Sequence, residues 1–400
     1  MKKVLICMLS LLLAVCVFVA CGKAKDATPT TEPKLNTTAT DADILQLEEL
    51  YKDRVAYHGE MHDHSDSGGR SDGHTELKLW TSVVLPEVDA DFAVIADHKQ
   101  TSHMRLPEWK AELYVGATEL ATTILDEHLK KGSMHYNIIH TDPDKIEEIL
   151  ATYPEFKLRE DVEENPGYNT FAYAKFSGED FRKVVQTITD KGGFFVQVHP
   201  CGASYDKGDN PLDFWYGDYT GFEVLAGWYY KDLKDERNIK AYNMWVGMLN
   251  LGKKVYACAG SDSHRKSLAS SLTTIYSSQK HAAGYLERMR AGDFTAGPVG
   301  IRMSVGDTCT GGETAFSGKR LVVSVGDFHS QMPKGEYEVV VYNENGEIFR
   351  EKLDTTQVQY FAIDTEACLY YRADVYSVTE GKIVAVGNPI FNTDVTVEAA

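Results

Sequence analysis

The sequence has few positive charges for its length and no apolar run long enough to span a bilayer with ease. Its 41 Lys and Arg residues face 59 Asp and Glu residues, so the net charge is 41 − 59 = −18, and without Lys2 and Lys3 it is −20. A protein this acidic repels nucleic-acid backbones, so no nucleic-acid partner is expected. With 43% hydrophobic and 25% charged residues among 400, the composition excludes a fibre or a wholly disordered chain and favours one large or two ordinary globular domains.

The one long apolar segment lies at the N-terminus. Val4 to Ala20 is broken only by Ser10, follows two lysines and ends just before Cys21. A transmembrane helix needs about 20 apolar residues, so this shorter run is more typical of a signal peptide. The last four residues, Phe18-Val19-Ala20-Cys21, resemble the lipobox of bacterial lipoproteins. We therefore expect residues 1–20 to be removed and Cys21 to be lipidated, which would anchor the protein outside the cytoplasm to a bacterial membrane through the lipid only.

Residues 21–45 have few apolar side chains and are rich in Thr, Lys and Pro. Such a segment cannot bury enough surface to fold, so it is predicted to be a flexible tether. Export would place the chain in an oxidising compartment, where four cysteines are candidates for disulfides in any of three pairings, with four buried thiols as the alternative. The four are Cys201, Cys258, Cys309 and Cys368.

Between residues 46 and 300, short apolar runs alternate with helical patterns. Strands are predicted at 54–58, 92–96, 194–198, 222–225 and 254–258. Helices are predicted between them, for example at Phe181–Asp190 and Asp235–Leu251. Apolar runs of four or five residues are typical of parallel strands buried on both faces, and about seven repeats of this alternation predict an α/β fold of the barrel type.

The pattern changes after Gly300. Strands are predicted at 321–325, 338–342 and 383–386, and hairpin turns at Asn345-Gly346 and Glu380-Gly381. These signals predict that residues 301–400 form a small all-β, sandwich-like domain. It contains no motif that indicates chemistry.

Histidines and carboxylates gather where the predicted strands of the α/β part end. His62 and His64 follow the first strand, and alternate positions on an extended segment point the same way, so both imidazoles can bind one ion. Other members of this pattern are Asp72, His98, Glu119, His135, His199, Asp262 and His264. Any one of them alone is as compatible with a surface residue, but thirteen histidines placed at random would not choose this edge repeatedly. A mixed imidazole and carboxylate set suits Zn, Mn or Fe rather than Ca or Mg.

In their order along the chain, these motifs resemble those of the PHP (polymerase and histidinol phosphatase) superfamily. The motifs are His62-x-His64, Ser71-Asp72-Gly73, Asp97-His98, Glu119, His135, His199-Pro200 and Ser261-Asp262-Ser263-His264. The segments His135-Tyr136-Asn137 and Trp245–His264 are similar to its carbaryl-hydrolase-like branch (CehA/McbA type). The resemblance covers about residues 55–300, and it implies a distorted (β/α)7 barrel at 46–300 that holds two or three divalent ions.

The resemblance also implies which residues would hold each ion. The first ion would be held by His62, His64, Glu119 and Asp262, the second by Glu119, His135 and His199, and the third by Asp72, His98 and His264. The segment between His64 and Asp72 is longer than the family pattern, and Glu223-Val224-Leu225-Ala226-Gly227 has Ala226 where the branch often has Asn.

Adjacent dications activate a bridging hydroxide and stabilise charge on a phosphoryl or acyl oxygen. We therefore predict a metal-dependent hydrolase, a phosphoesterase for small anionic esters, in which Glu119 and Asp262 support the metal hydroxide. Arg265 and Arg70 are candidates for binding the substrate's anion, whereas Lys99 is expected to be an ordinary surface charge. The alternatives are a carbamate or carboxylic ester hydrolase with the same site, or a surface binding protein with a vestigial barrel.

Overall fold

A large mixed β-sheet organises the computed structural model of the chain, whose described part lies in one unit, Thr37–Ala400. The described residues are 38–125, 133–156, 174–202, 208–227, 235–265, 271–395 and 397. Cys21, the predicted signal peptide and most of the predicted tether lie outside them. Among the helices that are described, none has the length and apolar character needed to cross a membrane.

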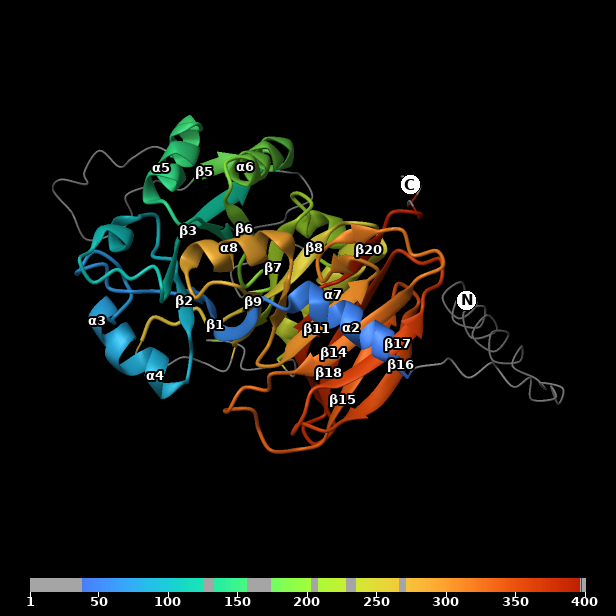
Figure 1. The fold of residues 1–400 in the computed structure, drawn as a ribbon. Coiled ribbons are helices and arrows are strands. Elements are labelled where there is room, and N and C mark those ends of the chain that lie inside the picture. The colour runs from blue at the N-terminus through green and yellow to red at the C-terminus, as the bar shows by residue number, and fades with distance from the viewer. Residues whose placement is uncertain are drawn as a thin grey trace, which may run out of the picture. The chain divides into compact units, whose positions relative to one another are not determined.

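Seven strands of the described residues form the central run of the sheet in the α/β part (Figure 1). They are β1 (Val55–Asp63), β2 (Phe92–Ile95), β3 (Tyr114–Ile124), β4 (Met134–Ile139), β6 (Phe194–Gln197), β7 (Thr220–Ala226) and β8 (Val255–Gly260). They pair in this order, and all run parallel except β4, which is antiparallel to both neighbours. A short strand, β5 (Ala174–Phe176), pairs with β3. The five predicted strands are confirmed, and their C-terminal ends share one edge of the sheet.

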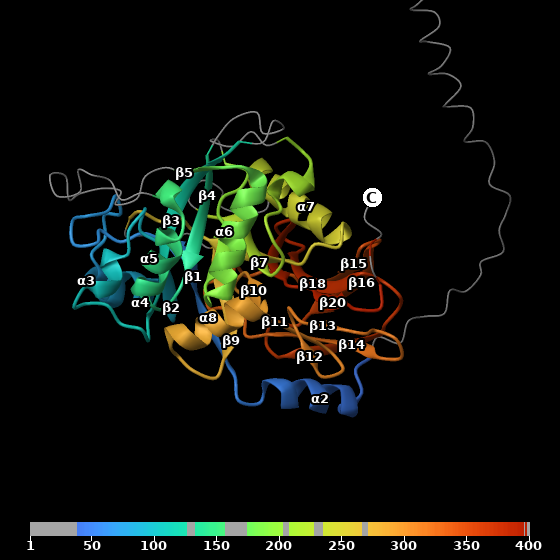
Figure 2. The same cartoon turned by 90° about the horizontal axis from the view of Figure 1, so that it is seen from above.

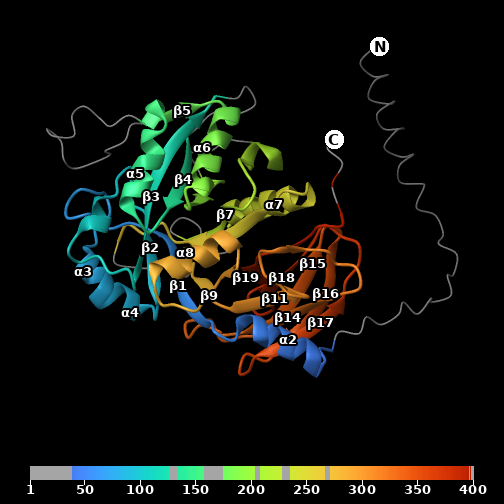
Figure 3. The same cartoon turned by 45° about the horizontal axis from the view of Figure 1, so that its top comes forward.

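Helices cover this sheet, as an α/β fold requires (Figure 3). They are α5 (Pro143–Ala151), α6 (Gly178–Asp190), α7 (Glu236–Asn250), α8 (Ala282–Ala291) and one helical run made of α3 (Leu77–Leu79), a π-helical turn (Trp80–Val84) and α4 (Leu85–Glu87). Single 3-10 turns occupy Ser102–Arg105, Pro154–Phe156 and Pro211–Phe214. Both helices predicted above are confirmed, and Gly252, with φ +72°, adopts the left-handed conformation that follows α7.

The sheet does not close into a continuous barrel in the described residues. β9 (Thr273–Ser277) pairs with β1 along Val55–Gly59, on the edge that β8 would need. β8 meets β1 only beyond that point, through a bridge between Asp63 and Ser263 and a hydrogen bond from Asp262 N to His62 O (2.8 Å). The expected closed ladder is therefore replaced by a contact at the C-terminal strand ends.

The secondary-structure elements described after Gly300 are all strands, as predicted. They are β11 (Gly300–Val305), β12 (Thr308–Cys309), β13 (Glu313–Thr314), β14 (Arg320–Gly326), β15 (Tyr337–Asn343), β16 (Gly346–Leu353), β17 (Gln359–Asp364), β18 (Tyr370–Ser377), β19 (Lys382–Gly387) and β20 (Ile390–Asn392). One sheet, β12-β11-β14-β17, shares an apolar core with β15 and β18, in which Met303 and Val323 pack with Val339 and Val375. The other sheet continues into the α/β part, because β19 pairs with β10 (Phe294–Ala296). A domain boundary near Gly300 stays a prediction.

The first described helix, α2 (Asp41–Tyr51), lies beside the sandwich (Figure 2). Thr40 and Asp43 form a capping box that starts it. Its buried face, Leu47 and Tyr51, packs on Tyr276, Val322 and Ala362. Residues 41–45, which the predicted tether includes, are thus the first turn of a packed helix.

Three of the described cysteines carry thiols rather than disulfides. Cys258 and Cys368 are buried and free, and Cys309 is half-buried and free. Burial raises the pKa of Cys368 to about 12, so this thiol stays protonated. The alternative of buried thiols therefore holds for Cys258 and Cys368.

Candidate metal centre

The shared edge of the sheet brings the predicted ligands together. His62 lies near the end of β1, His98 follows β2, and Asp262 follows β8. Glu119 lies within the long strand β3, and a bridge pairs it with His98. Parallel strands place their C-terminal ends side by side, so side chains distant in sequence meet here.

Three residues at this edge have strained backbones. Lys99, His199 and Asp262 follow three different strands and have φ values of +52°, +30° and +51°. L-residues avoid this left-handed region, and such strain collects at binding and active sites. Strain at the ends of three strands marks this edge as a candidate functional site.

Four side chains form what we call the inner group: His62, Glu119, His199 and Asp262. Each offers one ligand atom within 4.8 Å of the others. His62 Nε2 lies 3.3 Å from Glu119 Oε2 and 3.6 Å from Asp262 Oδ1, and His199 Nε2 lies 3.3 Å from Glu119 Oε1. All but His199 are buried.

Four others form the outer group: His64, Asp72, His98 and His264. Their ligand atoms also lie within 4.8 Å of one another, with Asp72 Oδ2 3.5 Å from His98 Nε2 and 3.6 Å from His264 Nε2. The His64 ring stacks against both other imidazoles, at centroid distances of 4.0 Å to His264 and 4.6 Å to His98. The Asp72 side chain is 39% exposed, so this group faces solvent.

Glu119 joins the two groups. Its Oε2 lies 3.2 Å from both His64 Nε2 and His98 Nδ1, in addition to its contact with His62. Its Oε1 lies 2.7 Å from Nδ1 of His135, the one predicted ligand outside both groups. Burial by itself raises the pKa of this carboxyl, but His98 and His135 with other imidazoles hold the pKa well below its usual range.

The donor set fits cations. His62 Nε2 and His64 Nε2 lie only 3.3 Å apart and both face the carboxylates of Glu119 and Asp262. Burial lowers the pKa of His64, but these carboxylates outweigh burial and raise the pKa to about 10. The site thus favours positive charge where the imidazoles and carboxylates converge. Imidazole nitrogens mixed with carboxylate oxygens are the ligands that Zn, Mn and Fe prefer.

The long segment after His64 still delivers Asp72 to the outer group. Asp97 accepts hydrogen bonds from Ser65 N (2.6 Å) and Ser65 Oγ (2.7 Å), which anchors the start of the segment. Its end is held by a hydrogen bond from His74 N to His264 O (2.8 Å). Two fixed ends allow an inserted loop to place its carboxylate accurately.

Sequence reasoning missed Glu223 as part of the site. Its Oε1 lies 3.3 Å from His62 Nδ1, and its Oε2 accepts a hydrogen bond from His199 N. One signal was available: Glu223 is the charged residue of an otherwise apolar strand, and a carboxylate is almost never fully buried without a partner.

The predicted anion-binding residues lie at the surface. Arg70 and Arg265 are exposed, each within two residues of an outer-group ligand. The expectation for Lys99 is wrong, because this residue is only 5% exposed. Its backbone explains the difference: Lys99 N donates to Glu119 O (2.9 Å), which draws the residue into the edge of the sheet.

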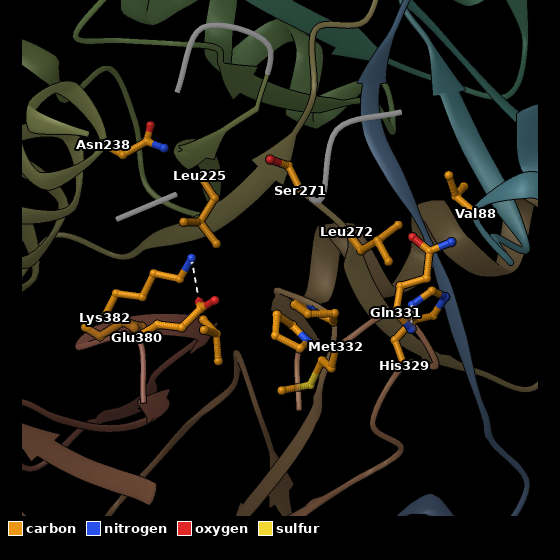
Figure 4. A pocket seen from close by; sticks show the side chains of 14 residues that line it. Val88, Leu225, Asn238, Ser271, Leu272, His329, Gln331, Met332, Glu380 and Lys382 are labelled. Atoms are coloured by element: carbon orange, nitrogen blue, oxygen red, sulfur yellow. Dashed lines mark hydrogen bonds and ion pairs between the residues drawn. The ribbon is translucent and has the colours of Figure 1, made fainter. Parts of the chain in front are cut away.

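A separate cavity of about 140 Å³ lies between the end of β7 and the turns of the sandwich (Figure 4). Leu225, Leu272 and Met332 supply apolar walls, and its charged side chains, Glu380 and Lys382, pair with each other at 2.7 Å. None of the nine predicted ligands lines it. The candidate metal centre is thus distinct from this cavity.

Known proteins add little to this geometry. No family model matches the chain, and no curated protein matches it. Among solved structures, the chain is similar to a two-domain protein from Bacteroides vulgatus ATCC 8482, described as containing a predicted PHP-like metal-dependent phosphoesterase. The match has 12% identity and a TM-score of 0.42 and covers 92% of this chain and 99% of that one. A likeness this distant assigns neither fold nor function.

Proposed function

We propose that the chain is a metal-dependent hydrolase of the PHP type, whose open sheet corresponds to that family's distorted barrel, and that it cleaves phosphate esters of small molecules. The observation that supports this most is the position of Glu119. One buried carboxylate contacts ring nitrogens of both the inner and the outer group, as expected of a residue that bridges two ions.

Two or three ions of Zn, Mn or Fe fit the donors present. The residues that would hold them are His62, His64, Asp72, His98, Glu119, His135, His199, Asp262 and His264. When bound, such ions acidify a coordinated water and neutralise charge that develops on a phosphoryl oxygen.

The chain's own residues would support the ions and bind the substrate. Glu119 and Asp262 are buried, so their charges act in a low dielectric and need no rearrangement during a reaction. The exposed side of the outer group is where a small substrate would approach. Arg70 and Arg265 are close in sequence to the outer-group ligands Asp72 and His264, and they would bind the anionic oxygens of the ester.

Metal content and turnover test this function together. Purified protein, freed of metal and then loaded with Zn, Mn or Fe, should hydrolyse nitrophenyl phosphate or bis-nitrophenyl phosphate and lose that activity on chelation. Turnover confined to neutral carboxylic or carbamate esters would replace the phosphoesterase with the ester hydrolase. Full activity after chelation would overturn the metal mechanism, and bound metal without any turnover would favour a binding protein.

We also propose that this hydrolase is a bacterial lipoprotein outside the cytoplasm, on the evidence of the sequence from Lys2 to Cys21. Wild-type protein should partition with membranes. Cys21→Ala should remain uncleaved or be released. Unchanged partitioning and gel mobility in this variant would contradict the lipid anchor.

A further inference from the structure

We propose that Glu223 is a positioning residue that sets the orientation of two inner-group ligands, His62 and His199, without binding an ion itself. This inference rests on the proposed function, because it concerns the same centre. It assigns a role to a residue that lies outside both ligand groups.

The two carboxylate oxygens of Glu223 contact different ligands. Oε1 lies 3.3 Å from Nδ1 of His62, while Nε2 of the same ring faces Glu119 and Asp262. Both ring nitrogens thus face a carboxylate, which only accepts hydrogen bonds, at 3.3 Å. Once an ion occupied Nε2, the ring proton would stay on Nδ1, where Glu223 accepts it. The contact therefore selects the ring form that a metal needs.

The second oxygen holds a strained backbone. Oε2 of Glu223 accepts a hydrogen bond from His199 N at 2.5 Å, and His199 has φ +30°. This left-handed conformation is costly for a residue with a side chain and persists only where surrounding contacts impose it. Through it, His199 Nε2 comes within 3.3 Å of Glu119 Oε1.

The neighbouring strand leaves room for this arrangement. A Cβ at Gly260, the last residue of β8, would lie 2.5 Å from Glu223 Oε1 and 2.5 Å from His62 Cβ. Real Cβ atoms do not approach other atoms so closely, so a side chain here would push the two partners apart. Gly260 is thus required for the contact between Glu223 and His62.

Gln at this position cannot replace the carboxylate. Glu223 accepts from two donors, the His62 ring and His199 N, whereas Gln offers one acceptor oxygen and one amide that donates. Glu223→Gln therefore leaves either the His62 ring in the wrong form or the His199 N–H without an acceptor. Gly260→Ala disturbs the same contact by volume alone and changes no polar group.

The experiment uses Zn²⁺ as the probe on the full chain. Zinc affinity is measured by competition with a chelating dye, and ¹⁵N-resolved NMR of the zinc-loaded protein shows which His62 nitrogen carries the proton. We expect Nδ1 in the wild type, and a change of this ring signal with about 10- to 100-fold weaker zinc binding in Glu223→Gln. Gly260→Ala should weaken binding in the same direction.

Glu313→Gln is the matched control. Glu313 contacts Tyr219 and Lys254, which precede the N-terminal ends of β7 and β8, so zinc binding should not change. A proton on Nε2 in the wild type, or an unchanged ring signal and affinity in Glu223→Gln, would overturn the role of Glu223. If Glu223→Gln does not fold, unchanged zinc binding in Gly260→Ala would overturn the role of Glu223 instead. A wild-type protein that binds none of Zn, Mn and Fe would instead overturn the proposed function.

Discussion

The inner and outer groups of the candidate metal centre both combine histidines with carboxylates but differ in the segments that position them. Inner-group side chains come from strands or the residues just after them, and all but His199 are buried. The outer group includes Asp72, which arrives on an inserted loop and is 39% exposed. Rigid, buried donors are organised before an ion arrives, so the inner group should bind tightly and the outer group should exchange its ion.

The largest effect is expected where the groups join. Glu119→Gln removes the charge that both groups share while nearly preserving the shape of the side chain. We expect metal loss from both groups and a fall in hydrolysis of about a hundredfold or more. Metal analysis and steady-state rates check this, with Glu148→Gln, an exposed residue of α5, as the control.

Partial metal removal should separate the groups next. A weak chelator should strip the outer group first, so zinc release should show two phases with affinities at least about tenfold apart. Dye-detected zinc release measures this. A single phase of zinc release would show that the two groups act as one site and would contradict the difference in affinity between them.

Asp72→Asn should weaken the outer group alone, by about tenfold in zinc affinity, because one of four donors loses its charge. The tight phase of zinc release should stay unchanged. Asp66→Asn, on the same loop but in neither group, is the control. Equal weakening of both phases would contradict an independent outer group.

Substrate binding should depend on the exposed side. Arg265→Ala should raise KM for phosphate esters about fivefold, with kcat nearly unchanged, if the guanidinium binds the anion before reaction. Neutral esters should not respond. An equal effect on charged and neutral substrates would assign Arg265 a structural role instead.

The smallest effect concerns His58, on the same strand as His62 but outside both groups. Burial and then the nearby His329 lower its pKa to about 4, although Asp91 opposes them. The unfolded chain, with a pKa of about 6.5, binds this proton more readily, so the free energy of unfolding falls as the pH drops from about 6.5 to 4.

His58→Gln removes that proton-binding difference. Between pH 7.5 and 5.0 the variant should lose less stability than the wild type, by about 1 to 2 kcal/mol, or roughly 2 °C in Tm. Thermal unfolding at the two pH values of metal-free protein measures it. Parallel losses in both proteins would place the acid sensitivity elsewhere.

Local patterns made the strands and ligands predictable from the sequence. A short apolar run followed by His or Asp, as in Phe194–His199, indicates both a strand and the edge where its ligand lies. Glu223 was missed because it lies inside such a run, where its partner depends on another strand. The open sheet was missed for the same reason. Only the long-range pairing of β9 with β1 shows that β9, rather than β8, occupies the free edge of β1.

The ladder between β10 and β19 has a consequence for inheritance. Ala296 pairs with Val386, and the Asn388 side chain accepts from Ala257 N (2.7 Å) and donates to Phe294 O (3.2 Å). A gene truncated or recombined near codon 300 would leave these backbone groups on an open strand edge, which is a template for self-association. We expect such a fragment to self-associate rather than to work as a smaller protein, so the part that carries the metal ligands depends on the last strands.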